Sequence, residues 1–207
     1  MHRQSRVLLV LTIFFAANRV NAETVLFFTS SPTNFIGMGA TRTITPVDHI
    51  FTATRKLEGD PFANSVRLKA TNKPGGVYDY WALDLIGSED SLPVVGEYFG
   101  AGHYPGQSLH QPGMRFYGNG RDETLTSSQF IVLEAVYDAS SQIQKFAVDF
   151  LQIERGDPAR WIHGSFRYNS TIPVTVPEPP TSVLGMSSAL FGLAIVLRRN
   201  RHRVASH

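Results

Sequence analysis

The sequence of 207 residues contains no cysteine. Disulfides, Cys-ligated zinc, iron–sulfur clusters and a thiol nucleophile are therefore excluded. The sequence also has no internal repeat, and it lacks the G-x-S-x-G motif of serine hydrolases and the H-E-x-x-H motif of zinc proteases. It does have an ordinary globular composition, 43% hydrophobic and 17% charged, with 14 Phe, 7 Tyr and 2 Trp to fill a core. The length suits one domain with targeting segments at its ends.

Basic residues are scarce in the middle of the chain and crowded at its ends. The formal net charge is +2, but Arg3, Arg6 and Arg19 lie near the N-terminus and four more Arg lie in the last ten residues. Between residues 23 and 171 the chain has 12 Lys and Arg against 16 Asp and Glu, a net charge of −4. Because this part lacks a basic footprint, we expect no nucleic-acid partner.

The first 22 residues have the pattern of a secretory signal peptide. Arg3 and Arg6 form a positive start, and residues 7–17 form an apolar run that is too short to span a bilayer comfortably. Small residues follow at the −3 and −1 positions of a cleavage site, which predicts cleavage after Ala22. The alternative is a buried N-terminal strand or helix.

The last segment, residues 173–207, has the pattern of a membrane anchor that follows a stiff linker. Prolines at 177, 179 and 180 favour an extended chain, and residues 183–197 are apolar and uncharged. A helix over 181–197 would span roughly 25 Å, enough for one transmembrane crossing. Clustered arginines then act as a basic stop that keeps this end cytoplasmic. They are Arg198, Arg199, Arg201 and Arg203.

The sequence Pro177-Glu178-Pro179, placed before this helix and its basic end, resembles a PEP-CTERM sorting signal. The resemblance implies recognition and processing by an exosortase, a membrane protease of Gram-negative bacteria that make exopolysaccharide. It further implies export through the inner membrane, a transient membrane anchor, and a final place at the cell surface or in the extracellular matrix. A plain single-pass anchor that is never cleaved is the alternative.

Hydrophobic residues between 23 and 172 alternate with period 2, which indicates strands. Residues 77–85 place Trp81, Leu83 and Leu85 on one face, and residues 129–137 and 143–153 flank a short polar loop, as in a hairpin. We therefore expect an all-β fold: an antiparallel β-sandwich, jelly-roll-like, between an N-terminal signal peptide and one C-terminal transmembrane helix. Further expected strands are 24–29, 49–55, 65–70, 94–99, 114–117 and 161–168.

The long polar connection 100–113, rich in Gly and Pro, is expected to be an exposed loop of functional interest. It carries His103 and His110, which either bind a metal or are ordinary exposed histidines. The isolated His49 and His163 fit no two-histidine metal spacing. We expect no cofactor and assign no metal site or catalytic residue.

Two kinds of side chain in the body could act on polysaccharide. Asp84, Glu134 and Asp149 lie within expected strands, where they could serve as the paired carboxylates of a glycosidase or could simply be solvated. Exposed aromatic rings could stack on sugars, or they could be packed in the core. The aromatic candidates are Tyr78, Tyr80, Tyr98, Tyr104, Tyr117 and Trp161.

The body also resembles a family of uncharacterised secreted bacterial domains, on the stretches 34–39, 130–138, 146–150 and 164–170. This resemblance implies a fold and no activity. We expect a non-enzymatic surface or matrix protein associated with exopolysaccharide. A polysaccharide-acting hydrolase that uses Asp or Glu and a purely structural adhesion module are the alternatives.

Overall fold

The computed structural model describes residues 21–56, 64–75 and 78–174, and these form ten β-strands and one short 3-10 helix, Ser88–Asp90. The predicted all-β class is confirmed, and most expected strands lie within two or three residues of their observed bounds. The strands are β1 (Glu23–Ser30), β2 (Thr41–Ile44), β3 (His49–Arg55), β4 (Val66–Asn72), β5 (Tyr80–Ile86), β6 (Gly96–His103), β7 (Gly113–Gly118), β8 (Thr126–Tyr137), β9 (Ile143–Glu154) and β10 (Trp161–Ser170).

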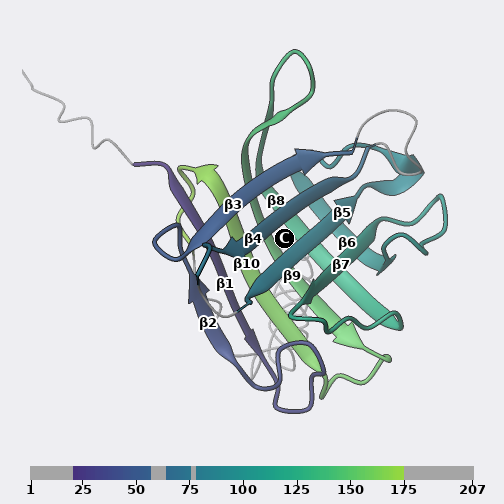
Figure 1. Cartoon of the computed structure of the whole chain (residues 1–207). Helices are drawn as coiled ribbons and strands as arrows, with labels where there is room; N and C mark the ends of the chain where they lie inside the picture. The colour runs from purple at the N-terminus through teal and green to yellow at the C-terminus, as the bar shows by residue number, and fades with distance from the viewer. Residues whose placement is uncertain (1–20, 57–63, 76–77, 175–207) are drawn as a thin grey trace, which may run out of the picture.

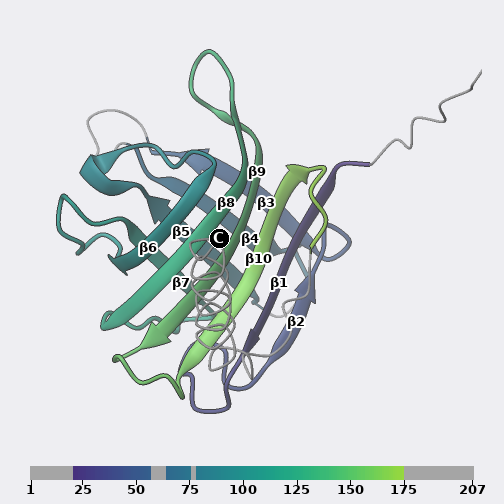
Figure 2. The ribbon, with the colours of Figure 1, turned by 180° about the vertical axis from the view of Figure 1, so that it is seen from behind.

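The strands form one sheet in the order β2-β1-β10-β9-β8-β6-β7-β5-β4-β3. All neighbours are antiparallel except β6 and β7, which run parallel. We call β2-β1-β10-β9-β8-β6 the β9 layer and β7-β5-β4-β3 the β5 layer. The β5 layer lies across the β9 layer in Figure 1, and Figure 2 shows the β9 layer from behind. The two layers face each other as those of a sandwich do, but they belong to one sheet that curls until its ends approach.

Strand β6 joins the two layers because it changes partner along its length. Tyr98 and Ala101 pair with β8, whereas Gly102 and His103 pair with β7. The change follows a bulge at Gly100, whose φ of 63° is the left-handed conformation that glycine adopts without strain. The expected 100–113 loop is therefore strand up to His103. This extension explains why one continuous sheet forms where two separate sheets were predicted.

Aromatic side chains from both layers form the core. Phe28 of β1 lies 4.5 Å from Trp81 of β5, and Phe116 of β7 lies 4.8 Å from Phe150 of β9, measured between ring centres. All four side chains are buried. Tilted and edge-on contacts at these distances are the favourable aromatic geometries, so the core holds the two layers against each other directly.

The predicted hairpin is confirmed. Strands β8 and β9 pair along most of their length, and their tip projects beyond the rest of the fold (Figure 1). At the tip, Asp138 Oδ1 accepts hydrogen bonds from the backbone N–H groups of Ser140 and Gln142. This is the local side-chain bonding by which Asp favours turns. Strand β2, in contrast, was not predicted, because four residues are too few to show a clear alternation.

The segment 34–39 is a tight turn built around a buried carboxylate. Glu154 is fully buried at the end of β9. Its carboxylate accepts hydrogen bonds from the Asn34 side chain at 2.8 Å and from the backbone N–H groups of Phe35 and Ile36 at 2.9 and 3.3 Å. Converging N–H groups of this kind form a concave anion site. The turn and the β9 end therefore depend on one buried carboxyl group.

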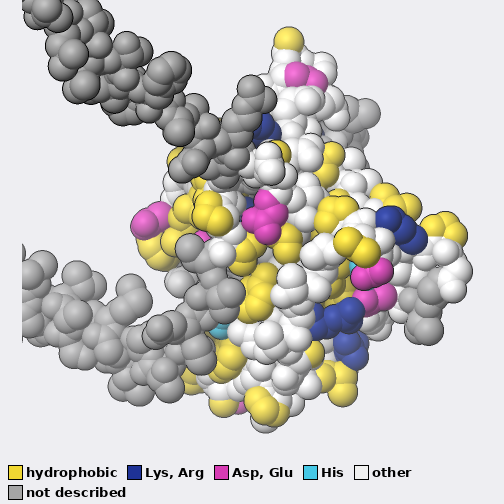
Figure 3. All heavy atoms as spheres, turned by 90° about the vertical axis from the view of Figure 1, so that its left-hand side faces the viewer, with side chains coloured by type: hydrophobic (Ala, Val, Ile, Leu, Met, Phe, Trp, Pro, Cys, Tyr) yellow, Lys and Arg dark blue, Asp and Glu magenta, His cyan; other side chains and the backbone are white. Residues whose placement is uncertain are grey.

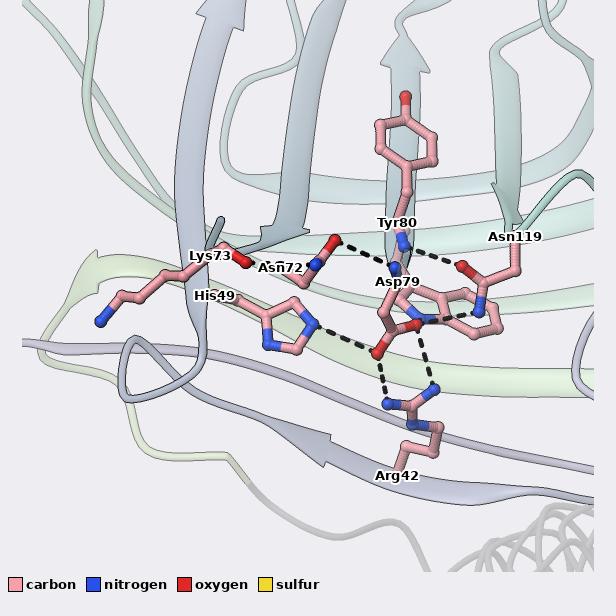
Figure 4. A network of polar contacts seen from close by, with 8 residues as sticks. Arg42, His49, Asn72, Lys73, Asp79, Tyr80 and Asn119 are labelled. Atoms are coloured by element: carbon pink, nitrogen blue, oxygen red, sulfur yellow. Dashed lines mark hydrogen bonds and ion pairs between the residues drawn. The ribbon is translucent and has the colours of Figure 1, made fainter. Parts of the chain in front are cut away.

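A second carboxylate, that of Asp79, holds the two end strands of the sheet together. Asp79 accepts two hydrogen bonds from Arg42 of β2, at 3.2 and 2.5 Å, and lies 3.2 Å from Nε2 of His49 of β3. It also accepts hydrogen bonds from Trp81 Nε1 at 2.7 Å and Asn119 Nδ2 at 2.9 Å. Figure 4 shows Arg42, His49 and Asn119 converging on the Asp79 carboxylate from separate parts of the chain.

The Asp79 carboxylate has a low pKa because of these partners. Burial raises the pKa, but the hydrogen bonds from Arg42, Asn119 and Trp81 outweigh burial and lower it to about 2. The group therefore stays ionised throughout the physiological range. We call Asp79 with Arg42, His49, Trp81 and Asn119 the Asp79 clasp.

The targeting predictions fall mostly outside the described residues. Ala22 is described, is exposed and directly precedes β1. The apolar run 7–17, the motif Pro177-Glu178-Pro179, the helix 181–197 and the terminal arginines are not described. In the described ranges, no helix is long and apolar enough to cross a bilayer.

Replacing Glu154 by Gln should destabilise the protein by about 3 kcal/mol, because the amide nitrogen of Gln would face N–H donors in a buried site. Chemical denaturation measures the loss, and hydrogen exchange should show reduced protection of the amides of Phe35 and Ile36. The matched control is Glu97→Gln, an exposed glutamate of β6, which should change stability by less than about 0.5 kcal/mol. Equal effects of the two substitutions would contradict the role given to Glu154.

Replacing Asp79 by Asn should cost about 2 kcal/mol at pH 7, because Arg42 and the other donors lose their ionised acceptor. The folded pKa of Asp79 lies below its ordinary value of 3.8, at about 2. Its contribution is therefore complete above about pH 5 and is lost as the pH falls toward about 2. Denaturation curves of the native and Asp79→Asn proteins should converge over that window, and curves that stay parallel would refute the assignment. Asp157→Asn, which removes an exposed ion pair with Arg160, is the control and should have little effect.

Candidate functional site

Three of the aromatic residues predicted from the sequence meet on the outer side of the β5 layer. Tyr78 lies two residues before Tyr80, which begins β5, and Tyr117 lies on the neighbouring strand β7. The side chains of Tyr80 and Tyr117 point away from the core because their chain neighbours Trp81 and Phe116 point into it. We call this surface of β4, β5 and β7 the tyrosine face. Its residues are Arg67, Lys69, Tyr78, Tyr80, Asp84, Arg115 and Tyr117.

Strand register sets the charged and aromatic side chains of this face in rows. Lys69 of β4 pairs with Ala82 of β5, which pairs with Tyr117 of β7. One row further along, Arg67 pairs with Asp84, which pairs with Arg115. Side chains in such cross-strand rows are direct neighbours, so residues far apart in the sequence lie together.

The rings of the tyrosine face are in contact. Tyr78 and Tyr80 are nearly parallel, with ring centres 6.3 Å apart, and Tyr78 is 68% exposed. The Tyr80 hydroxyl donates a hydrogen bond to the Tyr117 oxygen at 3.2 Å. The Arg115 guanidinium covers the Tyr117 ring at 4.2 Å, so Tyr117 offers its hydroxyl rather than its ring to a ligand. Tyr78 is the ring that stands open.

The charged groups of the face are partly neutralised. Asp84 is buried and accepts two hydrogen bonds from Arg67, at 2.6 and 3.0 Å. Arg115 donates to Asp122 at 3.1 and 2.5 Å. In the described part of the chain, the Lys69 ammonium has no ion-pair partner, and it lies 5.9 Å from the centre of the Tyr80 ring. The face thus has one ammonium group that remains available.

Burial, with a further contribution from Asp84, raises the pKa of Tyr117 well above the ordinary tyrosine range. The Arg67 pKa is raised mainly by its hydrogen bond to Asp84. Both groups therefore keep their protons at all physiological pH values. A protonated phenol and a neutralised carboxylate suit hydrogen bonding to hydroxyl groups and do not provide an open acid–base pair.

The other predicted aromatic residues serve packing. Tyr104 is 1% exposed and donates to Ser65 at 2.9 Å, and Tyr98 stacks on Phe130 with ring centres 4.4 Å apart. Trp161 stacks on His163 at 5.2 Å. Burial lowers the His163 pKa, which favours a neutral ring in this stack.

The three predicted carboxylates are divided between the two layers. Asp84 lies in the β5 layer, whereas Glu134 and Asp149 lie on β8 and β9 of the β9 layer. Glu134 accepts a hydrogen bond from Ser170 at 2.6 Å, and Asp149 accepts one from the fully buried Arg167 at 2.7 Å. All three carboxylates thus have structural partners.

The two loop histidines have separate acidic neighbours. His103 Nε2 lies 3.8 Å from Asp122, and His110 Nδ1 contacts Glu89. Burial lowers the pKa of His103, whereas Glu89 raises that of the exposed His110. Over residues 21–56, 64–75 and 78–174, no group of three or more His, Asp and Glu side chains is placed to hold a metal ion.

Sequence reasoning missed the cations of the tyrosine face. Arg67 and Lys69 alternate with buried residues in β4, which was the available signal for their outward direction. Their position beside Tyr80 and Tyr117 depends on which strands pair with β4. The alternation of buried and outward-facing residues along one strand does not identify its partners. In the space-filling view of Figure 3, Lys and Arg side chains lie beside Asp and Glu side chains at the right-hand side.

No family model, curated protein or solved structure matches this chain, so the geometry of the tyrosine face and the sequence of the chain are the basis for a functional proposal.

Proposed function

We propose that this protein is an exported, non-enzymatic module that binds extracellular polysaccharide through the tyrosine face. The observation that carries the proposal is the convergence of Tyr78, Tyr80 and Tyr117 on one outer surface of a rigid sheet. An open tyrosine ring packs against the C–H-rich face of a sugar. The Tyr80 and Tyr117 hydroxyls are placed to bond with sugar hydroxyl groups.

The setting of this activity is proposed from the two ends of the chain. A signal peptide ending at Ala22 would export the body, and the motif Pro177-Glu178-Pro179 would make the tail a substrate of an exosortase. The protein would be anchored transiently in the membrane and then released to the cell surface or extracellular matrix of a Gram-negative bacterium. Polysaccharide is abundant in that place, which agrees with a glycan-binding face.

Replacing Tyr78 by Ala should weaken glycan binding by about tenfold, because the open stacking ring is lost. Tyr117→Phe should weaken it by about threefold, because only one hydroxyl is lost. The measurement is affinity electrophoresis of the full chain in a non-ionic detergent, against a panel of acidic and neutral polysaccharides. The matched control is Phe99→Ala, which removes an exposed aromatic of β6 in the β9 layer and should leave binding unchanged. Absence of retention by every polymer would refute the proposed function.

Processing of the tail should leave a mature C-terminus between residues 177 and 181. Intact-mass spectrometry of the protein recovered from the cell surface measures this directly. Replacing Glu178 by Ala should cause the unprocessed chain to accumulate in the membrane fraction, whereas replacing Asp157, an exposed acid of the body, should not. A surface form that retains Arg203 would show that the tail is a plain anchor.

A further inference from the structure

The tyrosine face has more positive than negative charge, although the body as a whole is acidic. Arg67, Lys69 and Arg115 face two carboxylates, those of Asp84 and Asp122. Between residues 23 and 171, in contrast, Asp and Glu exceed Lys and Arg by 16 to 12. Because salt screens charges beyond about 8 Å at physiological ionic strength, a ligand on this face experiences the local charge more than the total.

The two guanidinium groups of the face are committed to partners inside the protein. Arg67 holds the buried Asp84 in a bidentate pair, and Arg115 holds Asp122 in another while covering the Tyr117 ring. Paired groups of this geometry are fixed in place and already neutralised. Lys69 differs from both, because its ammonium lies against Tyr80 and has no carboxylate partner in the described ranges.

Resting on the glycan-binding function proposed above, we propose that the tyrosine face selects acidic polysaccharides and that Lys69 pairs with a uronate carboxylate. The Tyr80 ring adjoins both the open ring of Tyr78 and the Lys69 ammonium, at 6.3 and 5.9 Å from its centre. An extended glycan that packs on Tyr78 therefore passes the ammonium. A flexible, compact Lys charge suits a carboxylate whose position varies along a polymer.

The acidic remainder of the body adds to this selection. A polyanion is repelled by the net negative charge elsewhere, so the locally positive face becomes its favoured docking position. The one acidic group at the centre of the face, Asp84, is 1% exposed and neutralised by Arg67, so it does not oppose the ligand. A neutral glycan would gain the stacking and hydroxyl contacts but not the ion pair.

The test compares pairs of polymers that differ only in charge. Polygalacturonate, alginate and hyaluronate are each tested beside their own carboxyl-reduced product, with the full chain in a non-ionic detergent, by biolayer interferometry. Each acidic polymer should bind about fivefold more tightly than its reduced product, because one exposed ion pair contributes about that much to the affinity. Lys69→Met should abolish that difference, because the acidic polymers lose their ion pair and then bind no more tightly than their reduced products.

Two variants serve as controls. Lys69→Arg retains the positive charge and should preserve the preference for acidic polymers. Lys145→Met removes a partly exposed lysine of β9, in the β9 layer, and should have no effect. Circular dichroism and thermal denaturation should show that all the variants are folded.

The outcomes separate the two proposals. Equal binding of acidic and reduced polymers, or an undiminished preference in Lys69→Met, overturns the charge selection and leaves the glycan-binding function standing. Failure of the native protein to bind any of the polymers, acidic or reduced, overturns both. Raising the salt concentration should lower the affinity for the acidic polymers only. An equal loss of affinity for the reduced polymers would also count against the role of Lys69.

Discussion

A sheet that curls back on itself has to hold its first and last strands together, and here one carboxylate contacts side chains of both. Arg42 belongs to β2, at one end of the strand order, and His49 belongs to β3, at the other. Both contact Asp79, and the Trp81 indole joins the same carboxylate to the aromatic core. The hydrogen-bond donors outweigh the cost of burying the charge, and for this reason the pKa of Asp79 falls to about 2 rather than rising.

The same carboxylate connects the fold to the proposed binding surface. Asp79 lies between Tyr78 and Tyr80 in the chain, and its partner Asn119 accepts a hydrogen bond from the Tyr80 backbone N–H at 2.8 Å. Asn119 comes two residues after Tyr117, so the clasp holds the backbone of both strands from which the rings project. The side chains of a binding site bind a ligand well when the backbone that carries them is held in a fixed geometry. The polar clasp beneath the tyrosine face gives this support.

Local patterns in the sequence were enough to predict much of the fold. The alternation in 143–153 predicted the strand whose Phe146, Val148 and Phe150 lie in the core, and the polar residues 138–142 predicted the hairpin turn. Strand β2 and the second half of β6 were missed. The first is too short to show a period, and the second depends on a bulge at Gly100 that lets the strand exchange β8 for β7. Partner exchange is a long-range event, and residues near Gly100 in the chain do not encode the identity of the new partner.

By itself, the sequence determined the all-β class and the absence of any thiol chemistry. The proposed export and sorting also rest on the sequence alone, since signal peptides and sorting motifs are recognised as linear segments. Only the tertiary structure decided that Tyr117 and Lys69 lie beside Tyr80, that Asp84 is neutralised by Arg67, and that Tyr98 and Tyr104 serve packing. The alternation of hydrophobic and polar residues with period 2 shows on which face of its own strand a residue lies. Which strands become neighbours is determined by the packing of the whole chain around Asp79 and the aromatic core.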